Sequence, residues 1–222
     1  MARTLAVVVL TGLHKLPSGV KAGFWLPDAA YTWLALHSAG WRVVAVSTRE
    51  GRPAQQGVDR SDPVQRGFLG DPGILRALEE TARPESLDAD RVGVLVFAGG
   101  VGALWDLPGD RCLAELTGHV VSGGGWVAAC CQGVAALLNV RLPNGAPFVK
   151  ERRLTAFSQH EEQILGIRGP LQLQKELAGL GARYSSNEPF RPHVVRDGRL
   201  ITGQNPASLP KLSRLLTRLK TT

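Results

Sequence analysis

Cysteine is scarce in this sequence, and long apolar runs are absent. Three cysteines occur among the 222 residues, and two of them, Cys130 and Cys131, are neighbours. An odd set with adjacent members argues against a disulfide framework. No Cys/His spacing fits a zinc site, so we expect no metal. No apolar run reaches the length of a membrane span, so we expect no membrane partner.

Basic residues outnumber acidic ones, yet they are scattered along the chain. The formal net charge is +7. Local clusters are Lys150–Arg153 and a C-terminal segment in which Lys211 and Lys220 stand among leucines. Because no recognised binding motif accompanies this charge, we expect no nucleic-acid partner. The segment Met1–Thr4 leads into an apolar strand without a signal-peptide cleavage site, and we expect a cytoplasmic protein.

Apolar strands alternate with helical segments along the chain. The strands lack an apolar-polar alternation, as expected when both faces of a parallel sheet are covered. This pattern predicts a three-layer α/β/α sandwich with a mostly parallel sheet, in one domain over residues 1–222. The expected strands are Leu5–Leu10, Trp41–Ser47, Val92–Phe97 and Trp126–Ala129, and the expected helices are Pro27–Ala39, Ile74–Ala82, Asp110–Val121, Leu171–Leu180 and a C-terminal helix with a leucine stripe from Leu209 to Leu219.

Three further segments have weaker patterns. The polar stretch Thr48–Gly70 contains Gly and Pro and is expected to be a loop. The segment Phe148–Thr155 is expected to form a short strand pair. The segment Val194–Thr202 is expected to form a hairpin, because its central Asp197-Gly198 pair favours a tight turn.

The run from Trp126 to Leu138 has the layout of a nucleophile elbow. An apolar strand enters a small–x–Cys–x–Gly motif in which Ala129 and Gly133 flank Cys131, and a helix-forming segment follows at once. Small residues are needed there because the strand-to-helix turn is tight. We expect the turn to strain Cys131, to expose its sulfur and to set it at a helix start, where the helix dipole favours the thiolate. The alternative is a buried cysteine in a pseudoenzyme.

Several chain segments are expected to meet at one edge of the sheet. In parallel α/β sheets the ligand site lies beyond the carboxyl ends of the strands. Cys131, the glycines after Phe97 and the segment after Leu10 all follow such ends. We therefore expect the functional site there.

With these elements placed, the chain resembles the ThiJ/PfpI superfamily of class I glutamine-amidotransferase-like proteins. The resemblance is greatest to the branch of the heat-shock chaperones and glutathione-independent glyoxalases (glyoxalase III, D-lactate dehydratase), and it implies a flavodoxin-like sheet and a homodimer. The segments that carry the resemblance are Gly23–Asp28, Ala98–Leu107, Cys131–Gly133, Leu154–Ser158 with Glu161-Glu162, and Asp197–Ser208.

The resemblance also implies roles for individual residues. Cys131 takes the position of the nucleophile, and Asp28 that of an acid beside it. Glu162 takes the position of the triad acid that orients the base. Without these roles, Glu162 is a carboxylate at a helix end and Asp28 is a solvated residue at a helix start. Backbone N–H groups of Gly99, Gly100 and Gln132 form the oxyanion hole in this reading, and Trp25, Val101 and Trp105 line the pocket.

Three positions depart from the pattern of that branch. Gln132 stands where the triad histidine is usual, and a glutamine cannot carry a proton at neutral pH. Asp28 replaces a glutamate, and Val101 replaces a histidine of the glycine loop. Of the five histidines, His14 and His160 are the candidates for a substitute base, because His14 follows the first strand and His160 precedes the acidic pair.

Three functions stay open at this point. The first is a cofactor-free cysteine enzyme that acts on small reactive carbonyls such as methylglyoxal, of the glyoxalase, D-lactate dehydratase or deglycase type. The second is a non-catalytic holdase chaperone or a sensor whose cysteine is oxidised. The third is another cysteine hydrolase or hydratase of the superfamily. The balance leans toward an enzyme.

Overall fold

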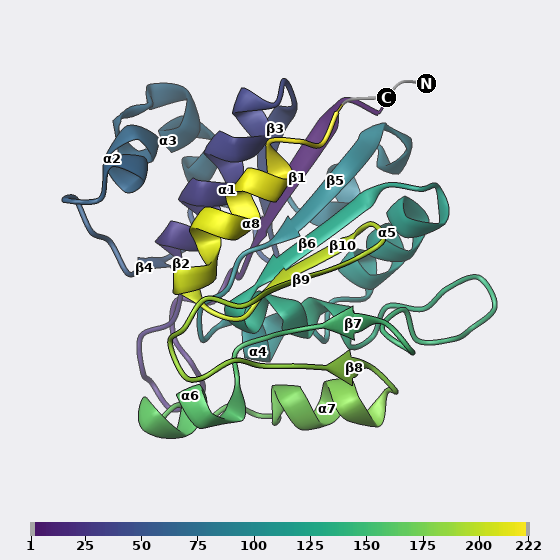
Figure 1. The fold of residues 1–222 in the computed structure, drawn as a ribbon. Helices are drawn as coiled ribbons and strands as arrows, with labels where there is room; N and C mark the ends of the chain where they lie inside the picture. Colours follow the sequence, from purple (N-terminus) through teal and green to yellow (C-terminus); the bar gives the residue numbers. More distant parts are fainter. Residues whose placement is uncertain (1–2, 221–222) are drawn as a thin grey trace.

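A computed structural model describes residues 3–220. Its centre is a twisted six-stranded sheet in the order β3-β1-β5-β6-β10-β9, in which all neighbouring pairs are parallel except β10 and β9 (Figure 1). The order places β1 and β5 inside the sheet, each between two other strands, and both are buried along their whole length. The strands are β1 (Leu5–Leu10), β3 (Arg42–Ser47), β5 (Val92–Phe97), β6 (Trp126–Cys130), β9 (Val194–Asp197) and β10 (Leu200–Gly203).

Helices cover both faces of this sheet. On one face α1 (Leu26–Ser38) and α8 (Leu209–Leu216) lie side by side, and on the other face lies α5 (Arg111–Ser122) (Figure 1). Side chains of β1 alternate between two apolar cores, with Val8 facing α1 and Val9 facing α5. Two cores separated by one sheet make the three-layer α/β/α sandwich that the sequence predicted.

Short strands, helices and 3₁₀ turns complete the chain. In Figure 1, α6 and α7 lie beyond the small β7-β8 pair at the lower edge of the molecule. The short strands are β2 (Phe24–Trp25), β4 (Gln55–Gln56), β7 (Arg153–Leu154) and β8 (Arg183–Tyr184). The remaining helices are α2 (Pro63–Gly70), α3 (Pro72–Glu79), α4 (Ala103–Asp106), α6 (Gln159–Ile164), α7 (Leu173–Gly179) and the 3₁₀ turns η1 (Pro84–Ser86), η2 (Ala89–Arg91), η3 (Cys131–Leu137) and η4 (Pro206–Ser208).

The predicted strands and turns are confirmed where the sequence is strongly apolar or has a distinct turn motif. The four predicted strands and the hairpin at Asp197-Gly198 are present, with boundaries within a residue or two. The predicted loop Thr48–Gly70 is wrong in part, because its end forms α2, which the Asp62 side chain caps. The predicted strand pair in Phe148–Thr155 is also wrong, since only β7 forms there and its partner is the distant β8. A single domain over residues 1–222 stays a prediction.

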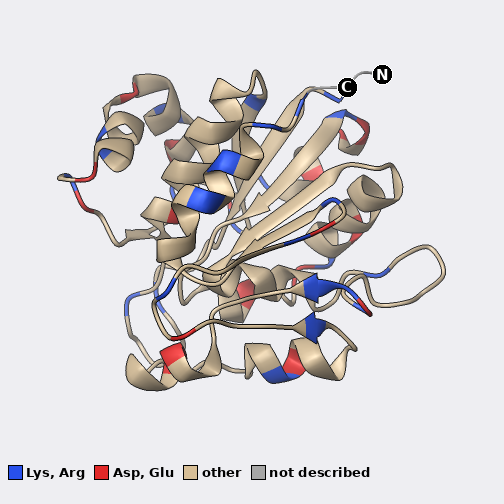
Figure 2. Ribbon diagram, in the orientation of Figure 1, with Lys and Arg blue, Asp and Glu red and all other residues tan. Residues whose placement is uncertain are grey.

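Basic residues are spread over several elements. Figure 2 shows Lys and Arg on α7, β7, β8 and α8. Every helix within residues 3–220 falls short of what a membrane crossing requires. The absence of a nucleic-acid partner remains a prediction.

Candidate active site

Cys131 lies at a strained turn directly after β6. Its φ is 58°, in the left-handed region that residues with a side chain rarely adopt. The turn packs so closely that a Cβ on Gly133 would lie 2.4 Å from the carbonyl oxygen of Phe97. The chain then continues as the 3₁₀ turn η3 rather than as an α-helix. The strand, the strained cysteine and the close glycine together form the predicted elbow.

A cavity of about 850 Å³ opens over Cys131. Cys131, Gln132 and Gly100 line it, and so do the three residues expected in the pocket, Trp25, Val101 and Trp105. The indole N–H groups of both tryptophans are buried without a hydrogen-bond partner. The wall is completed by apolar side chains from distant parts of the chain, among them Leu16, Phe157, Leu165, Ile167 and Phe190.

The sulfur of Cys131 is held as a thiol. The side chain is 5 % exposed, and its Sγ donates a hydrogen bond to Oε1 of Gln132 at 3.3 Å. Burial raises the pKa of Cys131 well above its usual range, and the nearby Asp28 carboxylate raises it further. Backbone N–H groups of Gln132 and Gly100 point to the sulfur and lower the pKa, but they do not offset burial. The expectation of an exposed thiolate is therefore wrong, because desolvation outweighs the helix end.

Asp28 is buried next to Gly99, which also packs against Cys131. The N–H of Gly99 donates to Oδ2 of Asp28 at 2.8 Å. A Cβ on Gly99 would lie 2.7 Å from both that oxygen and the Cβ of Cys131. Burial raises the pKa of Asp28 to about 7, against a smaller lowering by the Gly99 N–H. The other oxygen, Oδ1, has no partner. Asp28 is itself not among the residues that line the cavity, but it packs against the same glycine as Cys131.

Glu162 lies in α6 and is mostly buried. Its Oε1 has no partner. Burial raises the pKa of Glu162 to about 7, and the charge of Glu161 adds to the rise. Glu162 is not among the residues that line the cavity, and no hydrogen bond joins it to Gln132 in the described part of the chain. Its role as the triad acid therefore stays a prediction, because the structure does not bring Glu162 to the sulfur of Cys131.

The structure does not bring the two candidate histidines to Cys131. His14 is exposed in the segment after β1. His160 is exposed on α6 and lines a separate, polar cavity with Gln159, Glu188 and neighbouring residues. Neither side chain borders the cavity over the cysteine, nor does any other histidine within residues 3–220. Both side chains are exposed and outside the lining of this cavity, so a base role for either has no support from the geometry.

Glu161 is a buried residue whose role the sequence did not indicate. Its carboxylate accepts hydrogen bonds from the Ser158 hydroxyl and N–H, the N–H of Phe190, and the side-chain amides of Gln204 and Asn205. This carboxylate joins three segments of chain at the wall of the cavity. The Ser158–x–x–Glu161 pattern, which forms a capping box at the start of α6, was the available signal.

The described residues 3–220 include no group of three His, Cys, Asp or Glu side chains arranged to hold a metal ion. All three cysteines are free. What the site offers is a thiol, a buried carboxyl group, two backbone donors and an apolar cavity.

The sequence profile of the DJ-1/PfpI family matches residues 20–219. The chain is 34% identical to Glyoxalase 3 of Candida albicans over 61% of each chain. It is 26% identical to the glutathione-independent glyoxalase HSP31 of Saccharomyces cerevisiae over 94% of each. Rapid Encystment Protein 24 KDa of Francisella tularensis has a similar structure, with a TM-score of 0.92 and 26% identity over 97% of this chain and 98% of that one. The relatives support an enzyme, and the chain belongs to the DJ-1/PfpI family.

Proposed function

We propose that this protein is a glutathione-independent glyoxalase, which adds water to a 2-oxo aldehyde and rearranges it to a 2-hydroxy acid. Curated relatives carry glyoxalase names. The observation that carries the proposal is that a strained cysteine and a carboxyl group of pKa about 7 pack against the same glycine, Gly99. A group whose pKa lies near the working pH both takes and returns a proton efficiently.

The first step joins substrate and enzyme. The Cys131 sulfur attacks the aldehyde carbon, the C–S bond forms and the C=O π bond opens. The Asp28 carboxylate takes the thiol proton as the bond forms and delivers it to the new oxygen, which gives a hemithioacetal. Backbone N–H groups of Gly100 and Gln132, which point to the sulfur, stabilise the negative charge that develops on that oxygen.

The second step moves hydrogen between two carbon atoms. Asp28 removes the proton from the former aldehyde carbon, and an enediolate forms. The same carboxyl group returns the proton to the neighbouring carbon. The hydroxyl proton on the former aldehyde oxygen passes to the neighbouring oxygen, the C=O bond re-forms at the carbon that carries the sulfur, and a 2-hydroxyacyl thioester is left on Cys131. Water then attacks the thioester, the C–S bond breaks, and Asp28 passes a water proton to the sulfur. One aldehyde and one water give one hydroxy acid, and the free thiol is restored.

The geometry disfavours the alternative of an oxidation sensor. Cysteines that oxidise readily are accessible and have a low pKa. Cys131 is buried, and its pKa is raised. In the proposed glyoxalase reaction its sulfur becomes a nucleophile only as Asp28 takes the thiol proton. We also propose a homodimer, on the resemblance alone.

The test is the consumption of methylglyoxal without glutathione, with lactate measured as product. We expect activity in the native protein and its loss in Cys131→Ala, with both proteins folded by circular dichroism. Gln132→His is expected to leave the activity in place. No activity in the native protein, with a gain in Gln132→His, would mean a scaffold that has lost this chemistry.

A further inference from the structure

We propose that the substrate is a 2-oxo aldehyde with an apolar body much larger than the methyl group of methylglyoxal, and with a far end that is neutral or anionic. The inference rests on the proposed function for the reacting end of the substrate. The far end is argued from the cavity alone.

The size of the cavity is the first argument. Methylglyoxal has only five non-hydrogen atoms. The space over Cys131 is about 850 Å³, within the range of roughly 300–1,000 Å³ that encloses a drug-sized ligand. A five-atom substrate at the sulfur would leave most of this space to water. A built apolar cavity of this size therefore indicates a longer molecule.

The second argument is the apolar mouth of the cavity. Three side chains that line it are large, apolar and exposed: Val20 (60 %), Leu165 (56 %) and Phe190 (43 %). Exposed apolar side chains gathered at one opening mark a binding surface more strongly than single ones scattered over the surface. Their position at the entrance means that a substrate long enough to reach them gains contact area along its whole length.

The third argument is the charge at the cavity. Lys21 and Arg168 are the charged residues that line it, and no acidic side chain does so in the part of the chain described here. Neither cation takes part in an ion pair within residues 3–220. Two cations without a balancing acid repel a cationic end and accept a neutral or anionic one.

Product binding tests the inference without chemistry. Calorimetry would compare lactate with 2-hydroxyoctanoate on the native protein. Burial of one methylene is worth about a fourfold gain in affinity, and 2-hydroxyoctanoate has five more carbons than lactate. Burial of only half of this added chain gives about a thirtyfold tighter binding, which is the least that we expect. A ratio near one would overturn the proposal, even if both compounds were products of the enzyme.

Two neighbouring residues provide a matched control. Leu165 lines the cavity, whereas Ile164, 53 % exposed, does not. We expect Leu165→Ser to reduce the preference for the longer acid by about fivefold, because it removes apolar contact. Ile164→Ser is expected to leave the preference unchanged. If both variants reduced the preference for the longer acid equally, the acid would not be contacting the exposed apolar side chains at the opening of the cavity, and this part of the proposal would be contradicted.

The charge argument has its own probe. An 8-amino derivative of 2-hydroxyoctanoate carries a cation at the far end, and we expect it to bind on the order of fivefold more weakly than the parent acid. The double variant Lys21→Gln with Arg168→Gln is expected to reduce the difference in affinity between the two acids. Arg60 is exposed and does not line the cavity, so Arg60→Gln is expected to leave this difference unchanged. Equal affinity for the two acids would overturn the charge assignment.

Turnover separates this inference from the proposed function. Straight-chain 2-oxo aldehydes from three to nine carbons would be compared by kcat/KM, which is expected to rise along the series. If no aldehyde is converted but the hydroxy acids still bind by length, the proposed function fails and the cavity assignment stands. If all aldehydes are converted equally and the acids bind equally, the proposed function stands and the cavity assignment fails.

Discussion

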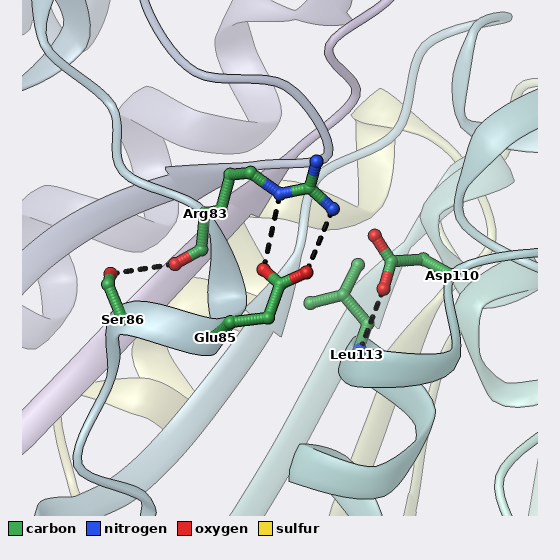
Figure 3. Close-up of polar contacts among 5 residues, drawn as sticks. All are labelled: Arg83, Glu85, Ser86, Asp110 and Leu113. Carbon is green, nitrogen blue, oxygen red and sulfur yellow. Dashed lines mark hydrogen bonds and ion pairs between the residues drawn. The ribbon is translucent and has the colours of Figure 1, made fainter.

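Cys112 and Cys131 show how differently one fold can treat a thiol. Cys112 is the second residue of α5 and is half-buried near the molecular surface. Arg83 donates two hydrogen bonds to Glu85 nearby, and Asp110 caps α5 at Leu113 (Figure 3). A hydrogen bond with Glu85 is the main cause that raises the pKa of Cys112. Arg83 in turn lowers the pKa of Glu85 to about 2, so this region is a set of mutually satisfied surface charges.

The surroundings of Cys131 are the opposite. The backbone is strained at the cysteine, and one carboxyl oxygen of Asp28 and the indole N–H groups of Trp25 and Trp105 are buried without partners. Unsatisfied polar groups in the interior cost stability. A protein keeps such groups where chemistry needs them. The contrast teaches that the chemistry of a thiol is indicated by what its neighbours leave unsatisfied, and not by its place at a helix start.

The largest expected effect is on stability at Asp28. Its pKa rises from 3.8 in the unfolded chain to about 7 in the folded state. The folded state therefore holds the proton more tightly, and the free energy of unfolding falls as pH rises from about 4 to about 7. The two pKa values correspond to about 4 kcal/mol of lost stability at pH 8.

Asp28→Asn removes this cost and keeps an acceptor for the N–H of Gly99. We expect urea unfolding to show a gain approaching 4 kcal/mol at pH 8 and little change at pH 4. Asp110→Asn is the matched control at the other cysteine, because asparagine caps a helix about as well as aspartate. If Asp28→Asn were not more stable than the native protein at pH 8, the Asp28 carboxylate would not destabilise the fold, and the contrast between the two cysteine regions would be wrong.

A smaller effect is expected from two glycines. A Cβ on Gly99 meets Asp28 and Cys131 at 2.7 Å, whereas on Gly109, near Cys112, the nearest atom is 3.9 Å away. We expect Gly99→Ala to lower the free energy of unfolding by about 1–3 kcal/mol and to reduce turnover. Gly109→Ala is expected to stay within about 0.5 kcal/mol. Equal losses in chemical denaturation would mean that the site is not packed as described.

The smallest effect is expected at Cys112 itself. Glu85→Gln removes the carboxylate that raises the pKa of this thiol. Iodoacetamide labelling at neutral pH, followed by peptide mass spectrometry, is expected to show about a two- to threefold faster reaction at Cys112. The rate at Cys131 serves as the internal control and is expected to stay constant. A change at Cys131 would show that the two regions are coupled.

The sequence was sufficient for the central sheet and for the elbow. Strands such as Leu5–Leu10 and Val92–Phe97 are apolar on both faces, which is a strong signal for a covered parallel sheet. The short helix α2 was missed because its eight residues include a proline and two glycines, which are typical of loops. A better reading of Asp62-Pro63, a cap followed by a helix-starting proline, would have indicated it.

The ionisation of the site could not be predicted from the sequence. A helix start after Cys131 suggested a low pKa, but the depth of burial decides the sign, and burial depends on the whole fold. His14 and His160 were expected near the site from their order in the chain, although their side chains are exposed elsewhere. The cavity wall is built from segments far apart in sequence, so its size was not accessible either.

The central claim is that Asp28 replaces a histidine as the group that moves the proton. The most direct measurement is the pH dependence of kcat/KM for methylglyoxal without glutathione, in the native protein and in Asp28→Asn. The carboxylate form is the base, so we expect kcat/KM to rise through about pH 7. Asp28→Asn is expected to lose about 10²–10⁴-fold and the inflection with it. An unchanged profile in the variant would contradict the account.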